Sequence, residues 1–208
     1  VEAAVNETWI LTVTFLIFFM HAGFAMLEAG QVRSKNVANQ LTKNMLTWSI
    51  GVTVFFVIGT GFESMMSGGG FSSVAGSGGY VGWLYGAVFA MTAATIVSGA
   101  VAGRAKLRAY IAYTFLLAAV IYPMITAFTW AAPETGLVEQ LVTGRIADFA
   151  GGIFVYVIVG ISALTGAVTL DPESVRYDAD CSVDVIIGAP MTFAVLGTRI
   201  LCFRLHTP

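Results

Sequence analysis

Three aromatic residues and one carboxylate have the chemical types to bind a small cation. Tyr85 and Phe89 are four residues apart, so their rings lie on one face if the segment is helical. Trp130 and Asp148 follow further along the chain. The face of an aromatic ring attracts a cation with about 0.5 to 2 kcal/mol, and a nearby carboxylate adds its own attraction. We therefore predict a cation-binding site of Trp130, Phe89 and Asp148, with Tyr85 beside it.

Each of these residues also has a structural interpretation. Trp130 at the end of an apolar segment is typical of a membrane-interface anchor. Phe89 can simply fill a helical core. Asp148 directly precedes an apolar run, where a carboxylate can accept backbone N–H bonds as an N-cap and face the positive end of a helix. Capping and cation attraction are compatible, so the two interpretations of Asp148 both stand.

The segments that carry these residues are apolar enough to lie in a membrane. The chain is 57% hydrophobic and 11% charged, with a mean hydropathy of +0.83, whereas soluble domains have about 25% charged residues. Helices satisfy their own backbone bonds in lipid and need about 20 apolar residues to cross it. We expect an all-α membrane protein, one membrane domain over 1–208. The predicted spans are 9–29, 45–62, 81–102, 109–132 and 149–170, with a partial sixth at 185–203.

Loop charges predict the orientation, because short cytoplasmic loops are enriched in Lys and Arg. Such residues cluster after the first and third predicted spans, at Arg33, Lys35, Lys43, Arg104, Lys106 and Arg108. We therefore expect a multi-pass protein of the plasma membrane with its N-terminus outside and its C-terminus in the cytoplasm. At about 1.5 Å per residue, Phe89 lies roughly 12 Å from the outer surface, and Tyr156 lies at about the same depth.

The remaining polar residues predict no enzyme chemistry. The sequence lacks recognisable metal-ligand, nucleophile and cofactor motifs. We expect no enzyme, no cofactor, no bound metal and no nucleic-acid partner. His21 has no second histidine within the spans to which it could pass a proton, and we interpret it as a neutral packing residue. Glu28 is expected to form a local ion pair with Arg33 or Lys35.

Two further features concern how the helices connect and pack. The first acid after the second predicted span is Glu63, and we expect a loop from there to Tyr80. Small residues recur at helical spacing and predict close helix contacts. They are Ala94, Ser98 and Ala102 on the third span and Gly160, Ala163 and Ala167 on the fifth.

Three segments, in this order and spacing, resemble the ammonium transporter, methylammonium permease and Rhesus glycoprotein family. They are Phe19-Met-His-Ala-Gly-Phe-Ala-Met-Leu-Glu-Ala-Gly30 with Arg33-Ser-Lys-Asn36, the run from Phe89 to Arg104, and Asp148-Phe-Ala-Gly-Gly152. The resemblance implies an eleven-span fold of two inverted five-span halves around a narrow pore, assembled as a homotrimer. This chain resembles the N-terminal half.

The resemblance also implies roles for the candidate residues. Phe89 and Tyr85 match the paired rings of the pore gate, Trp130 the aromatic residue of the outer ammonium site, and Asp148 the acid near that site. The implied activity is uptake of ammonium or ammonia, with methylammonium as an analogue, through a pore lined in this half by residue 156. A signalling protein on the cytoplasmic side is a possible regulator.

Departures from the family pattern favour a second hypothesis. Tyr156 replaces the family's first pore histidine, and a phenol, which titrates near 10, does not readily carry protons at neutral pH. Arg199 interrupts the sixth span, which we interpret as a premature end such as a frameshift produces. One hypothesis is ammonium transport by family, with this chain a truncated N-terminal half. The other is a non-transporting remnant, or a membrane binding or sensor module associated with complete transporter subunits.

Overall fold

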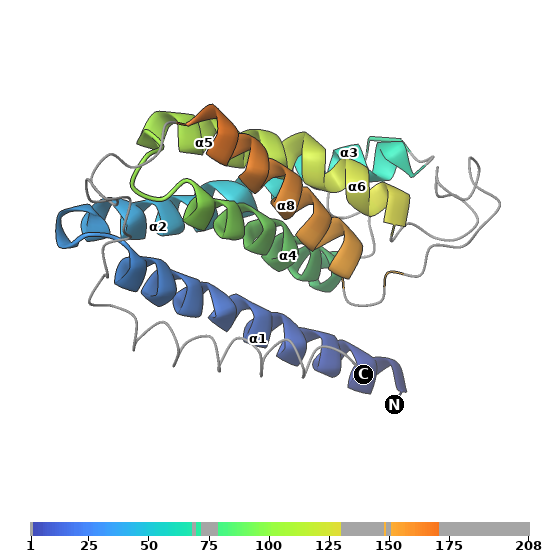
Figure 1. Cartoon of the computed structure of the whole chain (residues 1–208). Coiled ribbons are helices and arrows are strands. Elements are labelled where there is room, and N and C mark those ends of the chain that lie inside the picture. The colour runs from blue at the N-terminus through green and yellow to red at the C-terminus, as the bar shows by residue number, and fades with distance from the viewer. Residues whose placement is uncertain (1, 68–69, 72–78, 130–147, 149–150, 171–208) are drawn as a thin grey trace.

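The computed structural model describes residues 2–67, 70–71, 79–129, 148 and 151–170, and all regular structure in these ranges is helical. Figure 1 shows the arrangement. The elements are α1 (Glu2–Gln31), the 3₁₀ turn η1 (Ser34–Asn36), α2 (Val37–Val54), the π-helical turn η2 (Phe55–Gly59), α3 (Thr60–Met66), α4 (Gly79–Ala100), α5 (Leu107–Leu116), the π-helical turn η4 (Leu117–Ile121), α6 (Tyr122–Thr129) and α8 (Gly152–Thr169).

Several of these elements join into longer rods. From η1 through α3 the chain is one 33-residue helix, Ser34–Met66, and from α5 through α6 it is one 23-residue helix, Leu107–Thr129. With α1 and α4, these helices are long and apolar enough to cross a membrane, and α8 adds a shorter apolar helix. The five predicted spans therefore correspond to five observed helical rods. The predicted partial span at 185–203 lies outside the described residues.

The observed helices differ in length from the predicted spans, and two of these differences have a clear physical reason. The second rod continues through Glu63 to Met66, where a loop was expected, because glutamate is a good helix former and this one hydrogen-bonds to Thr126 of α6. The fifth rod begins at Gly152 instead of 149. Gly151 precedes it with a φ of +72°, a left-handed conformation that glycine adopts without strain.

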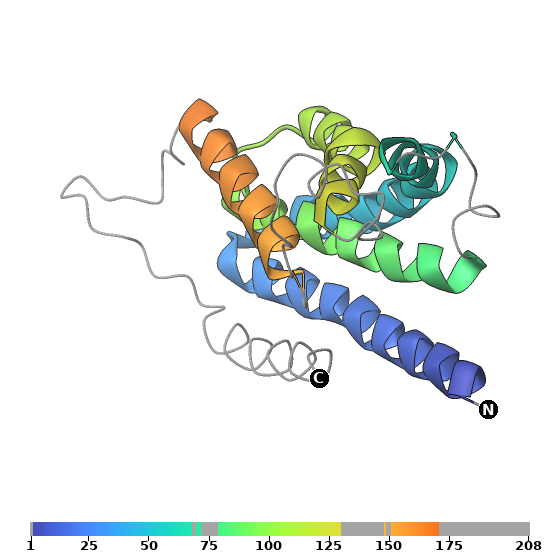
Figure 2. The same ribbon diagram turned by 90° about the vertical axis from the view of Figure 1, so that its right-hand side faces the viewer.

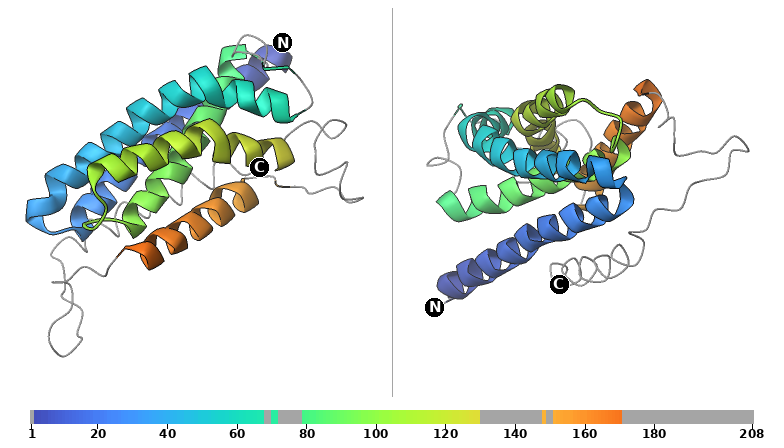
Figure 3. Two further views of the ribbon diagram at one scale, coloured as in Figure 1. Left: turned by 90° about the horizontal axis from the view of Figure 1, so that it is seen from above. Right: turned by 90° about the vertical axis from the view of Figure 1, so that its left-hand side faces the viewer.

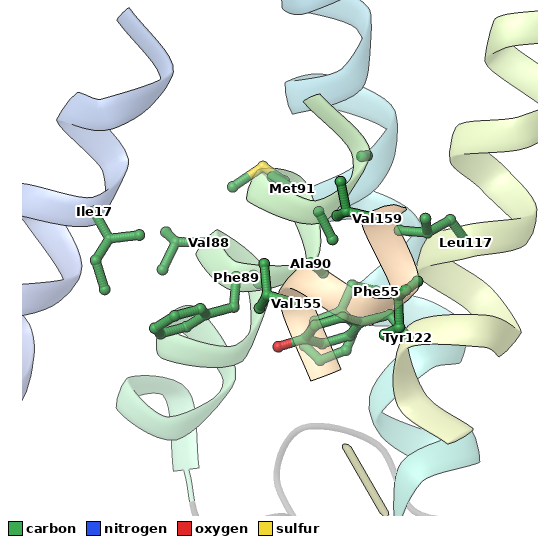
Figure 4. Close-up of a cluster of buried hydrophobic side chains, with 14 of the residues drawn as sticks. Ile17, Phe55, Val88, Phe89, Ala90, Met91, Leu117, Tyr122, Val155 and Val159 are labelled. Atoms are coloured by element: carbon green, nitrogen blue, oxygen red, sulfur yellow. The ribbon is translucent and has the colours of Figure 1, made fainter. Parts of the chain in front are cut away.

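α4 is the central helix of the bundle and contacts α1, α2 and α8. Figure 2 shows it between α1 and the α5–α6 rod. Most of its side chains from Ala87 to Ser98 are buried, as expected of a helix that is apolar on all sides. The core that forms around it includes Ile17 of α1, Phe55 of η2, Tyr122 of α6 and Val155 of α8 (Figure 4).

The α2–α3 and α5–α6 rods run side by side (Figure 3), and their π turns contact each other. Gly59 permits this contact, because a Cβ there would lie only 2.7 Å from the carbonyl oxygen of Ala118. On α4, the small residues Ala94 and Ser98 are buried as predicted. On α8 the prediction was wrong for Gly160, around which a Cβ would find open space, whereas Gly166 approaches Val101 closely.

Candidate functional site

The predicted aromatic pair is present on α4. The rings of Tyr85 and Phe89 meet edge to face, with centroids 5.0 Å apart and planes at 62°. Phe89 is only 6% exposed and belongs to the hydrophobic core, near Ile17 and Val155 in Figure 4. Tyr85, one turn nearer the start of α4, is half-buried. Both the packing role and the gate role predicted for Phe89 are compatible with this position.

A cavity of about 330 Å³ lies on the Tyr85 side of this pair. It is enclosed by α3, the first turns of α4, and α6, at the end of the bundle where the α2–α3 rod finishes. Its walls include Glu63, Trp83, Tyr85, Tyr122 and Thr126. Phe55 and Tyr122 form a second edge-to-face pair, with centroids 5.6 Å apart, that closes the cavity toward the core. A carboxylate and several aromatic rings therefore line the same cavity.

The structure describes only some of the other predicted site residues. Trp130 lies outside the described residues. Asp148 is half-buried, and its Oδ1 lies 3.8 Å from the position a Cβ on Gly152 would take. It stands near the start of α8 without being its N-cap, which is Gly151, so the capping prediction was wrong in register. Tyr156 is 44% exposed, whereas its neighbour Val155 is buried in the core.

The sequence interpretation missed a buried polar network at the opposite end of the bundle. Glu28 of α1 is 2% exposed and accepts hydrogen bonds from Gln40 Nε2 (2.7 Å) and Asn44 Nδ2 (2.5 Å) of α2. Ser98 Oγ of α4 donates to the second carboxylate oxygen, and Thr95 Oγ1 donates to Asn44 Oδ1 at 2.6 Å. One carboxylate thus ties α1, α2 and α4 together.

The ion pair expected between Glu28 and Arg33 or Lys35 was wrong, because Glu28 faces α2 and α4 while α1 ends at Gln31, before either base. The network has a sequence signal that we overlooked. Gln40 and Asn44 are four residues apart and present polar groups on one helical face.

A second polar contact extends this end of the bundle to α5. Thr47 Oγ1 and Tyr110 Oη are 2.5 Å apart. Lys43 is fully buried beside them, with its Nζ 6.0 Å from the centroid of the Tyr110 ring. Four helices therefore converge on polar groups at this end.

Long apolar helices joined by buried polar contacts define a multi-pass α-helical membrane protein. Sequence comparison narrows this class. A sequence model described as the Ammonium Transporter Family matches residues 8–205, and the chain belongs to that family. The match continues past Arg199 to residue 205.

Individual relatives agree with the family. The chain is 56% identical to the ammonium transporter Amt2 of Haloferax mediterranei, covering 98% of this chain and 46% of the relative. It is 38% identical to the ammonium transporter Amt2 of Archaeoglobus fulgidus, over 97% of this chain and 46% of that protein. The chain spans about half the length of these curated relatives.

A solved structure titled "Sensor Amt Protein" is 28% identical and superposes with a TM-score of 0.78, over 99% of this chain and 56% of that one. This likeness confirms the predicted fold class, an all-α membrane protein of the ammonium-transporter type.

Proposed function

We propose that the protein takes part in the transport of ammonium across a membrane. The observation that carries this proposal is the Tyr85–Phe89 ring pair, which lies beside a cavity on the central helix of a chain that belongs to the Ammonium Transporter Family. Curated relatives named ammonium transporters, aligned over nearly the whole chain, support it. The family, with its transporter relatives, favours transport over enzyme catalysis.

In this proposal Trp130, Phe89 and Asp148 bind the cation, and Tyr85 with Phe89 forms the gate. Ring faces attract the ammonium ion, while an apolar interior opposes passage of a bare charge by at least a few kcal/mol. The cation therefore either gives up its hydration water at the rings, or transfers a proton to water outside them and continues as neutral ammonia. Because Phe89 is packed into the core, its ring must rotate before anything passes. Tyr156, on the exposed side of α8, lines the pore beyond the gate.

The proposed setting is the plasma membrane, with the N-terminus outside and the C-terminus in the cytoplasm. This orientation places the Tyr85 cavity at the outer surface and the Glu28 network near the inner surface. The transporting form is a homotrimer, and a signalling protein on the cytoplasmic side is its regulator. Loop bases such as Arg33 and Arg104 support this orientation through the positive-inside rule.

A second candidate function is a binding or sensor module that does not conduct and associates with complete transporter subunits. Two observations favour it. The chain is similar to a solved structure titled "Sensor Amt Protein", and position 156 carries a tyrosine, which shuttles protons poorly at neutral pH. Both candidates share the outer cation site and differ in conduction.

An assay of methylammonium uptake distinguishes the two candidate functions. Cells that lack other ammonium carriers would express the chain, and labelled methylammonium uptake would be compared with an empty-vector control. Transport predicts uptake that falls at least about fivefold in Trp130→Leu, as expected when a binding aromatic worth over 1 kcal/mol is lost. The matched control is Trp9→Leu, which removes an exposed tryptophan of α1 and should leave uptake unchanged.

Binding of methylammonium to the purified chain completes the test. Saturable binding without uptake would establish the non-conducting candidate in place of transport. A correctly inserted chain that neither binds nor takes up methylammonium would contradict both.

A further inference from the structure

Glu63 is an acid without a basic neighbour along the chain. No other charged residue occurs between Lys43 and Arg104. The opposite wall of the cavity is formed by α6, and the whole stretch from 109 to 129 is likewise uncharged. Glu63 nevertheless lies on α3, inside a helix long and apolar enough to span a membrane. An ionisable residue in such a helix is costly and commonly marks a path or site for an ion.

The surroundings of Glu63 suit a small cation. The cavity of about 330 Å³ exceeds the roughly 30 Å³ that one water occupies in the liquid, so a cation and part of its hydration shell fit. Tyr85, Trp83 and Tyr122 line it, and aromatic rings attract a cation. The buried Nε1–H of Trp83 has no hydrogen-bond partner among the described residues, and a water in the cavity can accept a hydrogen bond from it.

Glu63 also has a structural contact that must be separated from any binding role. Its carboxyl group lies beside the hydroxyl of Thr126 on α6 and interacts with it. Thr126 Oγ1 also bonds to the carbonyl oxygen of Pro123 at 3.0 Å. If the carboxyl served only to clamp α3 to α6, then loss of either partner would have the same effect.

We propose that Glu63 is a binding residue for a small monovalent ammonium-type cation, which it holds in the cavity next to Tyr85, ahead of the Tyr85–Phe89 pair. The identity of the cation rests on the proposed function. Glu63 provides the negative charge, and the aromatic rings line the cavity. The cation moves from this cavity to the Tyr85–Phe89 gate. The site adds to the predicted outer residues a carboxylate that comes from a different helix.

Two variants distinguish charge from clamping. Glu63→Gln keeps the size of the side chain and one acceptor oxygen and removes its negative charge. Thr126→Val keeps the carboxylate and removes the hydrogen bond with nearly the same volume. A charge several ångströms from the cation changes its affinity by roughly five- to thirtyfold at the effective dielectric of a partly wet site. Glu63→Asp retains the charge and keeps most of the affinity.

Trp83 provides a local signal for binding. The purified chain, labelled with 5-fluorotryptophan, would be titrated with methylammonium chloride, with sodium chloride as the control for ionic strength. The fluorine resonance of Trp83 would be assigned through Trp83→Phe. We expect a saturable shift with methylammonium, a midpoint at least about fivefold higher in Glu63→Gln, and midpoints within about threefold of wild type in Thr126→Val and Glu63→Asp.

An unchanged midpoint in Glu63→Gln would overturn the inference, and so would equal weakening in Glu63→Gln and Thr126→Val. If Glu63→Gln loses its helical circular dichroism, Glu63→Asp and Thr126→Val still decide, because the inference requires both to bind. Transport is measured separately. Uptake without a Trp83 response contradicts only this site, and a Trp83 response without uptake contradicts only conduction.

Discussion

Replacing Glu28 with alanine should destabilise the end of the bundle that holds its hydrogen-bond network more than any substitution at an exposed position of α1 does. The carboxylate accepts bonds from Gln40, Asn44 and Ser98, of which Gln40 and Ser98 are buried and Asn44 is half-buried. Glu28→Ala removes the shared acceptor and leaves a gap in its place. Two effects therefore act together, lost hydrogen bonds and a lost packing volume.

The expected loss of unfolding free energy depends on whether the donors that lose Glu28 find other acceptors. Hydrogen bonds within membrane proteins average about 0.6 kcal/mol, which sets a lower limit of about 2 kcal/mol for three bonds. A buried donor with no acceptor costs about 1–3 kcal/mol. Fallback acceptors exist, because Asn44 Nδ2 also reaches Gln40 O at 3.2 Å and Ser98 Oγ reaches Thr95 O at 2.7 Å. We therefore expect a loss of about 2–4 kcal/mol in the free energy of unfolding.

The measurement is reversible denaturant unfolding of the purified chain in detergent micelles, followed by circular dichroism. Glu7→Ala is the matched control, since Glu7 is an exposed acid on the same helix and should change stability by less than about 0.5 kcal/mol. A Glu28→Ala/Ser98→Ala double-mutant cycle should give a coupling of at least about 0.5 kcal/mol. Equal stability of Glu28→Ala and Glu7→Ala would refute the view that this network fastens the helices.

Two other predictions use the same unfolding measurement. Gly59→Ala should destabilise the chain by about 1–3 kcal/mol, since its Cβ would press on the backbone at Ala118, whereas Gly160→Ala meets open space and should be neutral or slightly stabilising; equal effects would contradict the close contact of the two π turns. Tyr110→Phe should cost about 1 kcal/mol by leaving Thr47 without its 2.5 Å partner, and Tyr80→Phe, at an exposed ring, should cost nothing measurable.

The helices could be predicted from the sequence because each uncharged run is long enough to span lipid and can satisfy its own backbone only as a helix. The Tyr85–Phe89 contact was equally predictable, since a spacing of four on one helix brings two rings together without any tertiary information. The exact residues at which the helices begin were less predictable, because hydropathy does not mark them. Gly151 turns the chain just before α8, and nothing in its local composition distinguishes it from Gly152.

Glu28 and Glu63, the two acids near the ends of apolar helices, show why the sequence alone did not reveal their different roles. In the sequence Glu28 and Glu63 look alike, as single carboxylates near the end of a predicted span. Across the bundle, Glu28 is surrounded by donors from two other helices, so its charge is already satisfied and its role is cohesion. Among the described residues, Glu63 lies beside the Thr126 hydroxyl and lines a cavity together with several aromatic rings. A carboxylate that lines a cavity can attract a mobile cation, whereas one bonded to several fixed donors is less available for this role. This difference arises only when α3, α4 and α6 meet.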